Sequence, residues 1–152
     1  MRIILCVTND IVTDCRIGRI AASLLKLPAT ITIIGLLLPN SPVLPDYPYR
    51  TERFRLVFRK GPLFYAELNI RLFFRLLFTP ADLLVANDLD TLAAVYAASF
   101  FKRLPVVYDS HEYFTELPEL IGRPLVKNIW TLLESSLLPR IHYASTVSPS
   151  IA

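Results

Sequence analysis

The sequence predicts an α/β fold: a doubly wound, mainly parallel, Rossmann-like sheet with helices on both faces. Short apolar and β-branched runs alternate with segments of helical period along the 152 residues, which is typical of this architecture. The first run is apolar at every position, as expected for a strand that is buried on both faces. Polar residues follow several runs directly, where the binding loops of a parallel sheet lie.

The amino-terminal part predicts a β-α-β unit. Ile3–Val7 is bounded by polar residues and predicts the first strand. Asp14 precedes a helical pattern that ends at Pro28, because proline cannot continue a helix. The apolar residues of this pattern are Ile17, Ile20, Ala21 and Leu24. Thr30–Leu36 is rich in β-branched residues and predicts a second strand, joined to the first by a right-handed crossover.

A proline-rich loop separates this unit from the next strand and helix. Residues Leu37–Arg50 contain repeated prolines, which prevent a long ladder or helix there. Phe54–Arg59 alternates apolar and basic residues and predicts a half-exposed strand. Leu63–Phe78 follows a helical period, is nearly all apolar, and ends before a proline.

Three more strands complete the predicted order. Leu83–Ala86 predicts a strand, and Leu92–Phe101 predicts a helix with acidic residues before it and basic residues after it, which suits the helix dipole. Val106–Tyr108 predicts the next strand. A helix begins at Pro124 and runs through Leu137, and Ala144–Val147 predicts the last strand.

The sequence ends on the signals of a helix start. Ser148 suits an N-cap and Pro149 suits the first helical position, yet the sequence stops at Ala152. We therefore expect residues 1–152 to form one Rossmann-like, amino-terminal domain of a longer protein, with a further domain absent from this chain.

The composition favours a protein without membrane-spanning helices. No apolar run approaches the roughly 20 residues that a spanning helix needs. Met1 and Arg2 precede a strand-like run rather than a secretory signal, so we expect a cytoplasmic location. The apolar fraction of 53% exceeds the usual range of roughly 45 to 50%, so we expect some apolar surface to meet a partner.

Basic and aromatic residues are concentrated between Arg50 and Arg75. Two interpretations are equally favoured. The region presses on an anionic membrane surface or a lipid-linked substrate, which would make the protein peripheral on the inner face of the membrane, or it is a buried helix whose arginines reach solvent. Nucleic acid is a poorer partner, because the net charge is only +3 and the aromatic residues recur like core residues.

Several kinds of site are unsupported by the sequence. The glycines are too far apart for a dinucleotide or P-loop motif, so a nucleotide would be held mostly elsewhere. Two separated histidines and two separated cysteines form no metal-ligand pattern. Cys6 lies within a strand pattern and is expected to be a buried, reduced thiol.

Polar residues after three strands are the candidate site. His111 is the side chain best suited to proton transfer near pH 7, and we take it as the candidate catalytic residue. The candidate substrate-binding residues are Asn9, Asp10, Asp14, Asn87, Asp88, Asp90, Asp109, Ser110, Glu112 and Glu116. A structural alternative stands beside this one: Asp14 and Asp88 suit helix caps, and Asp90 suits the first turn of a helix.

Four stretches together carry a resemblance to a known family. They are TNDIVTDCRIGRIAASL, LLVANDLDTLAA, VVYDSHEYFTELPEL and TVSPSIA. In this order they resemble the amino-terminal half of bacterial group-one, or family-four, retaining glycosyltransferases of the two-Rossmann GT-B fold. The resemblance runs from Ile3 to Ala152.

The resemblance implies an acceptor-side domain whose partner domain, absent here, holds the nucleotide-sugar. It places His111 near the transferred sugar and the loop Asn9–Asp14 near the donor phosphates. It implies metal-independent transfer with retention to a glycan or lipid-linked acceptor, as in cell-surface polysaccharide synthesis, and no cofactor beyond the nucleotide-sugar substrate. The alternative function is a non-catalytic scaffold module that recruits a catalytic partner to a membrane.

Overall fold

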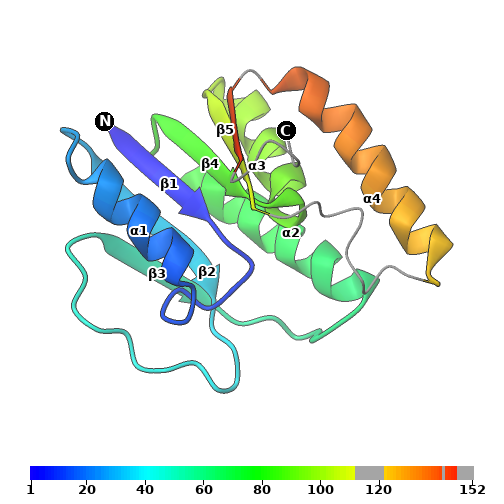
Figure 1. The fold of residues 1–152 in the computed structure, drawn as a ribbon, viewed down its shortest axis with the longest axis horizontal. Helices are drawn as coiled ribbons and strands as arrows, with labels where there is room; N and C mark the ends of the chain where they lie inside the picture. Colours follow the sequence, from blue (N-terminus) through cyan, green and yellow to red (C-terminus); the bar gives the residue numbers. More distant parts are fainter. Residues whose placement is uncertain (112–121, 142, 147–152) are drawn as a thin grey trace.

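A computed structural model describes residues 1–111, 122–141 and 143–146. Within them the chain forms a parallel six-stranded sheet of order β3-β2-β1-β4-β5-β6 (Figure 1). The strands are β1 (Arg2–Cys6), β2 (Thr30–Leu36), β3 (Arg50–Phe54), β4 (Leu83–Asn87), β5 (Val106–Ser110) and β6 (Tyr143–Thr146). The helices are α1 (Cys15–Leu24), α2 (Pro62–Phe78), α3 (Leu89–Lys102), α4 (Pro124–Leu137) and the short 3-10 helix η3 (Leu138–Arg140). The predicted fold class is confirmed.

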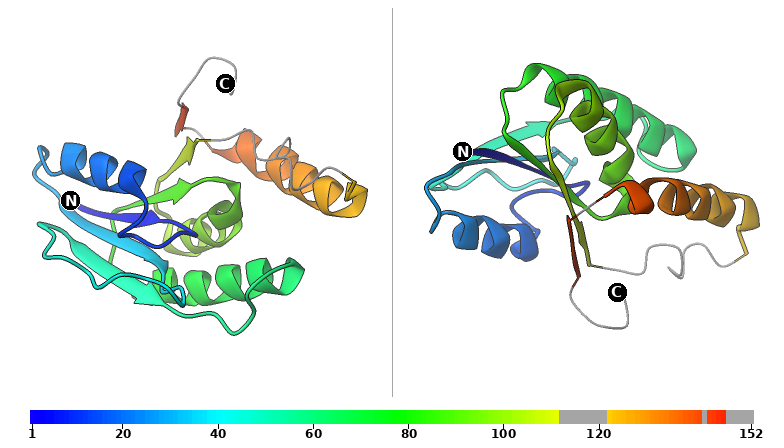
Figure 2. Two further views of the ribbon diagram at one scale, coloured as in Figure 1. Left: turned by 60° about the horizontal axis from the view of Figure 1, so that its bottom comes forward. Right: turned by 90° about the horizontal axis from the view of Figure 1, so that it is seen from above.

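Helices cover both faces of the sheet (Figure 2). On one face α1 packs through Ile17 and Ala21 onto the odd-numbered positions of β1. On the other face α2, α3 and α4 form one apolar core with Ile4 and Cys6 of the same strand. This alternation is the two-residue period of a strand buried on both sides, and it explains the continuous apolar run. Cys6 is fully buried, and burial raises the pKa of its thiol.

The structure corrects the position of the third strand. The sequence predicts a strand over Phe54–Arg59, whereas β3 is Arg50–Phe54 and pairs in parallel with Thr32–Leu36 of β2. The residues after Phe54 leave the sheet at its carboxyl edge. Two of their backbone N–H groups, those of Val57 and Phe58, donate to the carboxylate of Glu67 on α2 instead of to a strand.

One helix begins earlier than predicted. The sequence predicts Leu92 as its start, whereas α3 begins at Leu89, directly after Asp88. The other helix starts and ends agree with the predictions to within a few residues. Among the described residues, no helix has both the length and the apolar character needed to cross a membrane.

A close backbone approach positions the loop that follows β1. The N–H of Leu36 in β2 donates to the carbonyl of Asn9 at 3.1 Å. A Cβ on the neighbouring Gly35 would lie 2.9 Å from this carbonyl oxygen and 2.8 Å from Cγ1 of Ile11. Only glycine leaves room for this contact, which holds the loop against the carboxyl end of β2.

Candidate functional site

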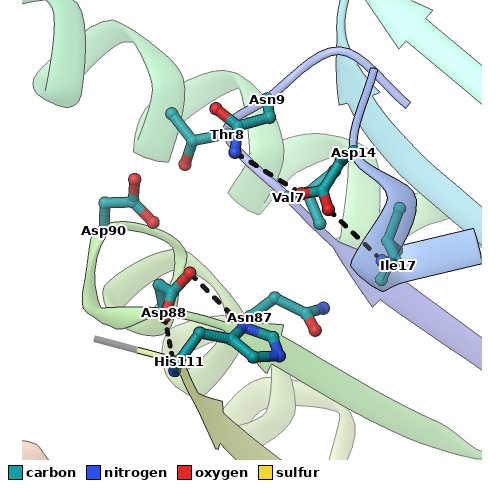
Figure 3. A pocket seen from close by; sticks show the side chains of 9 residues that line it. All are labelled: Val7, Thr8, Asn9, Asp14, Ile17, Asn87, Asp88, Asp90 and His111. Carbon is teal, nitrogen blue, oxygen red and sulfur yellow. Dashed lines mark hydrogen bonds and ion pairs between the residues drawn. The ribbon is translucent and has the colours of Figure 1, made fainter. Parts of the chain in front are cut away.

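A narrow pocket lies at the carboxyl ends of β1 and β4, beside the start of α1 (Figure 3). Val7, Thr8, Asn9, Asp14, Ile17, Asn87, Asp88, Asp90 and His111 line it. Its enclosed space is about 20 Å³, enough for about one water-sized group. The pocket therefore accepts a single polar group rather than a whole sugar ring.

Asp14 connects the pocket to α1. Its carboxylate accepts from the N–H groups of Arg16 and Ile17 at 3.0 and 3.3 Å, as an N-cap does. The other carboxylate oxygen accepts from Nδ2 of Asn9 at 3.4 Å. The capping alternative for Asp14 is confirmed, and the cap also holds the Asn9 side chain beside the pocket.

Asp88 adopts a strained backbone conformation at the end of β4. Its φ is 65° and its ψ 165°, a region that glycine occupies far more readily than other residues. Its side chain does not cap α3 but accepts from the N–H of His111 at 2.9 Å. Its own N–H donates to the carbonyl of Asp109 at 2.9 Å. Asp88 therefore ties the carboxyl end of β4 to that of β5.

His111 lies between two carboxylates. Its Nε2 is 3.1 Å from Oδ2 of Asp109, and its Nδ1 is 3.6 Å from Oδ2 of Asp88. Its side chain is only 8% exposed. A neutral imidazole donates through one nitrogen, whereas a protonated ring donates through both. Because both nitrogens face carboxylates, the ring orientation is fixed.

Three buried oxygen atoms at the pocket have no hydrogen bond of normal geometry within the described residues: Thr8 Oγ1, Asn87 Oδ1 and Asp90 Oδ1. Asn87 is 4% exposed and uses its Nδ2 to donate to the carbonyl of Cys6 at 3.1 Å. Burial raises the pKa of Asp90 to about 7, the charge of Asp88 adds to the rise, and the Thr8 hydroxyl opposes it. Unsatisfied buried oxygens are costly, and a bound hydroxyl or amino group would satisfy them.

The remaining candidates lie outside the pocket. Asp10 is 2% exposed and forms an ion pair with Arg53 of β3 at 3.0 Å, and its carboxylate also accepts from Ser41 and from the N–H of Val12. Burial alone would raise the pKa of Asp10, but these hydrogen bonds and the charge of Arg53 lower it. Ser110 is buried at the end of β5. Two further candidates, Glu112 and Glu116, lie outside the described residues.

The structure adds two residues that the sequence did not single out, Arg16 and Arg19. Together with His111 and the side of α1 they line an open groove of about 470 Å³. The groove shares His111 with the narrow pocket, so the two spaces adjoin at this residue. The spacing of the two arginines on one face of α1 was the available signal. Within the described residues, no cluster of three His, Cys, Asp or Glu side chains could hold a metal ion.

Comparison with known proteins supports the fold and no closer relationship. No protein-family model and no curated protein matches the chain. The solved structure of UDP-GlcNAc 2-epimerase from Methanocaldococcus jannaschii is similar, with a TM-score of 0.53 and 17% sequence identity. The match covers 99% of this chain and 45% of that one, so the chain spans less than half of its structural neighbour. The likeness shows a Rossmann-like fold of the GT-B-like type.

Proposed function

We propose that this chain is the acceptor-side domain of a glycosyltransferase, which moves a sugar with retention from a nucleotide-sugar to a glycan or lipid-linked acceptor. The proposal rests mainly on one observation: unsatisfied buried oxygens of Asn87 and Asp90 face a one-group pocket beside His111. The GT-B-like fold supports it, because the structural neighbour is an enzyme named for a nucleotide-sugar.

The charge of the site suggests which part of the substrates it takes. Carboxylates of Asp14, Asp88 and Asp109 lie at or next to the pocket, so a diphosphate would be repelled there. The same oxygens accept hydrogen bonds from sugar hydroxyls. We therefore assign the diphosphate to a second domain, and the sugar ring to the groove beside α1 with one hydroxyl in the pocket.

His111 positions the ligand rather than supplying a free base in this arrangement. Both ring nitrogens face carboxylates, so the ring presents its edge to the groove. The adjacent carboxylates would stabilise the positive charge that develops at an anomeric carbon when the diphosphate leaves. No step of this proposal requires a metal or another cofactor.

A second candidate is an epimerase that acts on a nucleotide-sugar. The structural neighbour favours it, since that protein is a UDP-GlcNAc 2-epimerase. An epimerase changes the configuration of its sugar without an acceptor, whereas a transferase releases the nucleotide only when it transfers or hydrolyses the sugar. The products therefore distinguish the two.

The test is an assay of the full natural protein with nucleotide-sugars, with and without glycan and lipid-linked acceptors. A new glycosidic product in the presence of acceptor supports the transferase, and an epimerised nucleotide-sugar without acceptor replaces it with the second candidate. Binding to a catalytic partner with neither product would support the scaffold alternative. His111→Ala should lower turnover at least tenfold with an unchanged melting temperature, whereas Lys26→Ala, at an exposed position just after α1, should leave turnover unchanged.

A further inference from the structure

A second pocket lies at the same edge of the sheet, after β2 and β3. It has a volume of about 340 Å³, within the roughly 300 to 1,000 Å³ usual for ligand sites. Its apolar lining comes from residues 36–39 and from Leu56, Phe58 and Phe64. Arg55 and Arg59 are the charged residues among those that line it. The pocket is thus largely apolar, with two cations.

Within the described residues Arg55 and Arg59 form no ion pair, unlike most arginines around them. Elsewhere in the region three arginines form ion pairs: Arg53 with Asp10, Arg71 with Glu67, and Arg75 with Glu52. Within the described residues, Arg55 and Arg59 are exposed and no ion pair involves them, and the same holds for the adjacent Lys60. The positive charge predicted for the whole region is therefore available mainly beside this pocket.

The surroundings of the pocket suit a ligand with an anionic head and an apolar chain. Val57 is 73% exposed, Phe58 43% and Leu63 58%, so apolar surface continues from the pocket to the solvent. The nearby amino end of α2 has no capping side chain and no acidic residue in its first turn, and its N–H groups add partial positive charge. A hydrophilic phosphate compound would leave the apolar wall without a partner.

We propose that this pocket binds a lipid whose head group carries phosphate, with the hydrocarbon chain against Leu56 and Phe64 and the phosphate beside Arg55 and Arg59. The charge complementarity and the apolar wall are the basis for choosing this ligand. The inference goes beyond the proposed function, because lipid binding here does not depend on sugar transfer. In a transferase, the same pocket would hold a lipid-linked acceptor.

The test uses isothermal titration calorimetry of the purified protein with three ligands: inorganic phosphate, monodecyl phosphate and decyl maltoside. The last two are amphiphiles and are kept below their critical micelle concentrations. Monodecyl phosphate should bind at least tenfold more tightly than either of the others. Arg55→Glu combined with Arg59→Glu should weaken this binding about tenfold or more, since each basic residue contributes about 1 kcal/mol toward an anionic lipid. Phe58→Ser should weaken monodecyl phosphate binding without changing that of inorganic phosphate.

Two matched double variants locate the effect. Lys26→Glu with Arg123→Glu changes the net charge equally at exposed positions after α1 and before α4, and Arg50→Glu with Arg103→Glu does so at the start of β3 and at the end of α3. Both should bind monodecyl phosphate within about twofold of the unaltered protein. Equal losses in all three double variants, or equal affinity for inorganic and monodecyl phosphate, would overturn the proposal. A circular dichroism spectrum and melting curve verify that each variant is folded.

Discussion

The carboxyl edge of the sheet carries two regions of opposite character. After β1, β4 and β5 the edge is acidic, and its narrow pocket is lined by Asp14, Asp88 and Asp90. After β2 and β3 it is basic and apolar, with Arg55 and Arg59 at a wider pocket. One edge of one sheet thus offers acceptors for hydroxyl groups on one side and cations for an anion on the other.

A buried ion pair lies between the two regions. Asp10, in the loop after β1, reaches across β2 to Arg53 in β3, with their side chains 2% and 11% exposed. Because these two charges neutralise each other, neither adds to the acidic or to the basic pocket. Acidic residues close together in sequence therefore have different roles: Asp10 stabilises the fold through its ion pair with Arg53, while Asp14 lines the acidic pocket.

The largest expected effect comes from breaking the buried ion pair between Asp10 and Arg53. Arg53→Met leaves the Asp10 carboxylate buried and without its cation, which should lower the free energy of unfolding by about 3 to 5 kcal/mol. Urea denaturation at pH 7 measures it. The pKa of Asp10 is lowered in the folded state, so the stabilisation is present at neutral pH and lost as pH falls below about 4.

A double variant provides the control. Asp10→Asn with Arg53→Met removes both charges and should recover part of the lost stability, because no buried charge is then left unpaired. If the losses in the free energy of unfolding were additive in the double variant, the two residues would act independently and the ion pair would not stabilise the fold.

Hydrophobic periodicity and the positions of prolines predicted most of the helices and strands, whereas the position of β3 depends on its pairing with β2. The alternation of buried runs and helices predicted the fold class but not the order of the strands, and Pro28 and Pro124 marked helix boundaries close to those observed. The position of β3 was wrong because Phe54–Arg59 alternates in the manner of a strand, while Arg50–Phe54 does not. Arg50–Phe54 forms the strand because its backbone pairs with β2, and the local sequence pattern carries no information about this pairing.

The candidate site was predictable only to the level of its loops. Strand ends pointed to Asn9, Asn87 and Asp88, and these lie together in the structure. Sequence could not show the structural role of Asp10, because the partner of Asp10 is Arg53, which is distant along the chain. The pairing of Arg71 with Glu67 follows from their four-residue spacing on one helix. Sequence could not show that Arg75 pairs with Glu52 of β3 while Arg55 forms no ion pair within the described residues, since this depends on how β3 and α2 lie together.

The next expected effect tests the acidic region through the pH dependence of stability. Burial raises the pKa of Asp90 to about 7, above its value of 3.8 in an unfolded chain. The folded protein therefore holds an extra proton between about pH 4 and pH 7, so the free energy of unfolding falls as pH rises across this range. The full difference is on the order of 4 kcal/mol.

Asp90→Asn should abolish this part of the pH dependence, because an amide carries no titrating proton. The variant should be more stable than the unaltered protein at pH 8 and similar to it at pH 4. Thermal unfolding at a series of pH values between 4 and 8 provides the comparison. Parallel curves for the two proteins would contradict a raised pKa at Asp90.

The smallest expected effect compares the left-handed backbone positions of the two regions. The basic region has Gly61 there, with a φ of 76°, whereas the acidic region has Asp88, with a φ of 65°. Asp88→Gly and Asp88→Ala both remove the acceptor for the His111 N–H, but only glycine relieves the backbone strain. Asp88→Gly should therefore be more stable than Asp88→Ala by about 1 to 2 kcal/mol.

Gly61→Ala is the matched control on the basic side. A Cβ at Gly61 meets no atom within 4 Å, so its cost isolates the backbone term, which should be about 1 kcal/mol. If Asp88→Gly and Asp88→Ala were equally stable while Gly61→Ala was destabilised, Asp88 would not be strained. If the expected difference is found, the acidic region keeps an unfavourable backbone in order to hold a carboxylate against His111, as expected where geometry serves a ligand rather than stability.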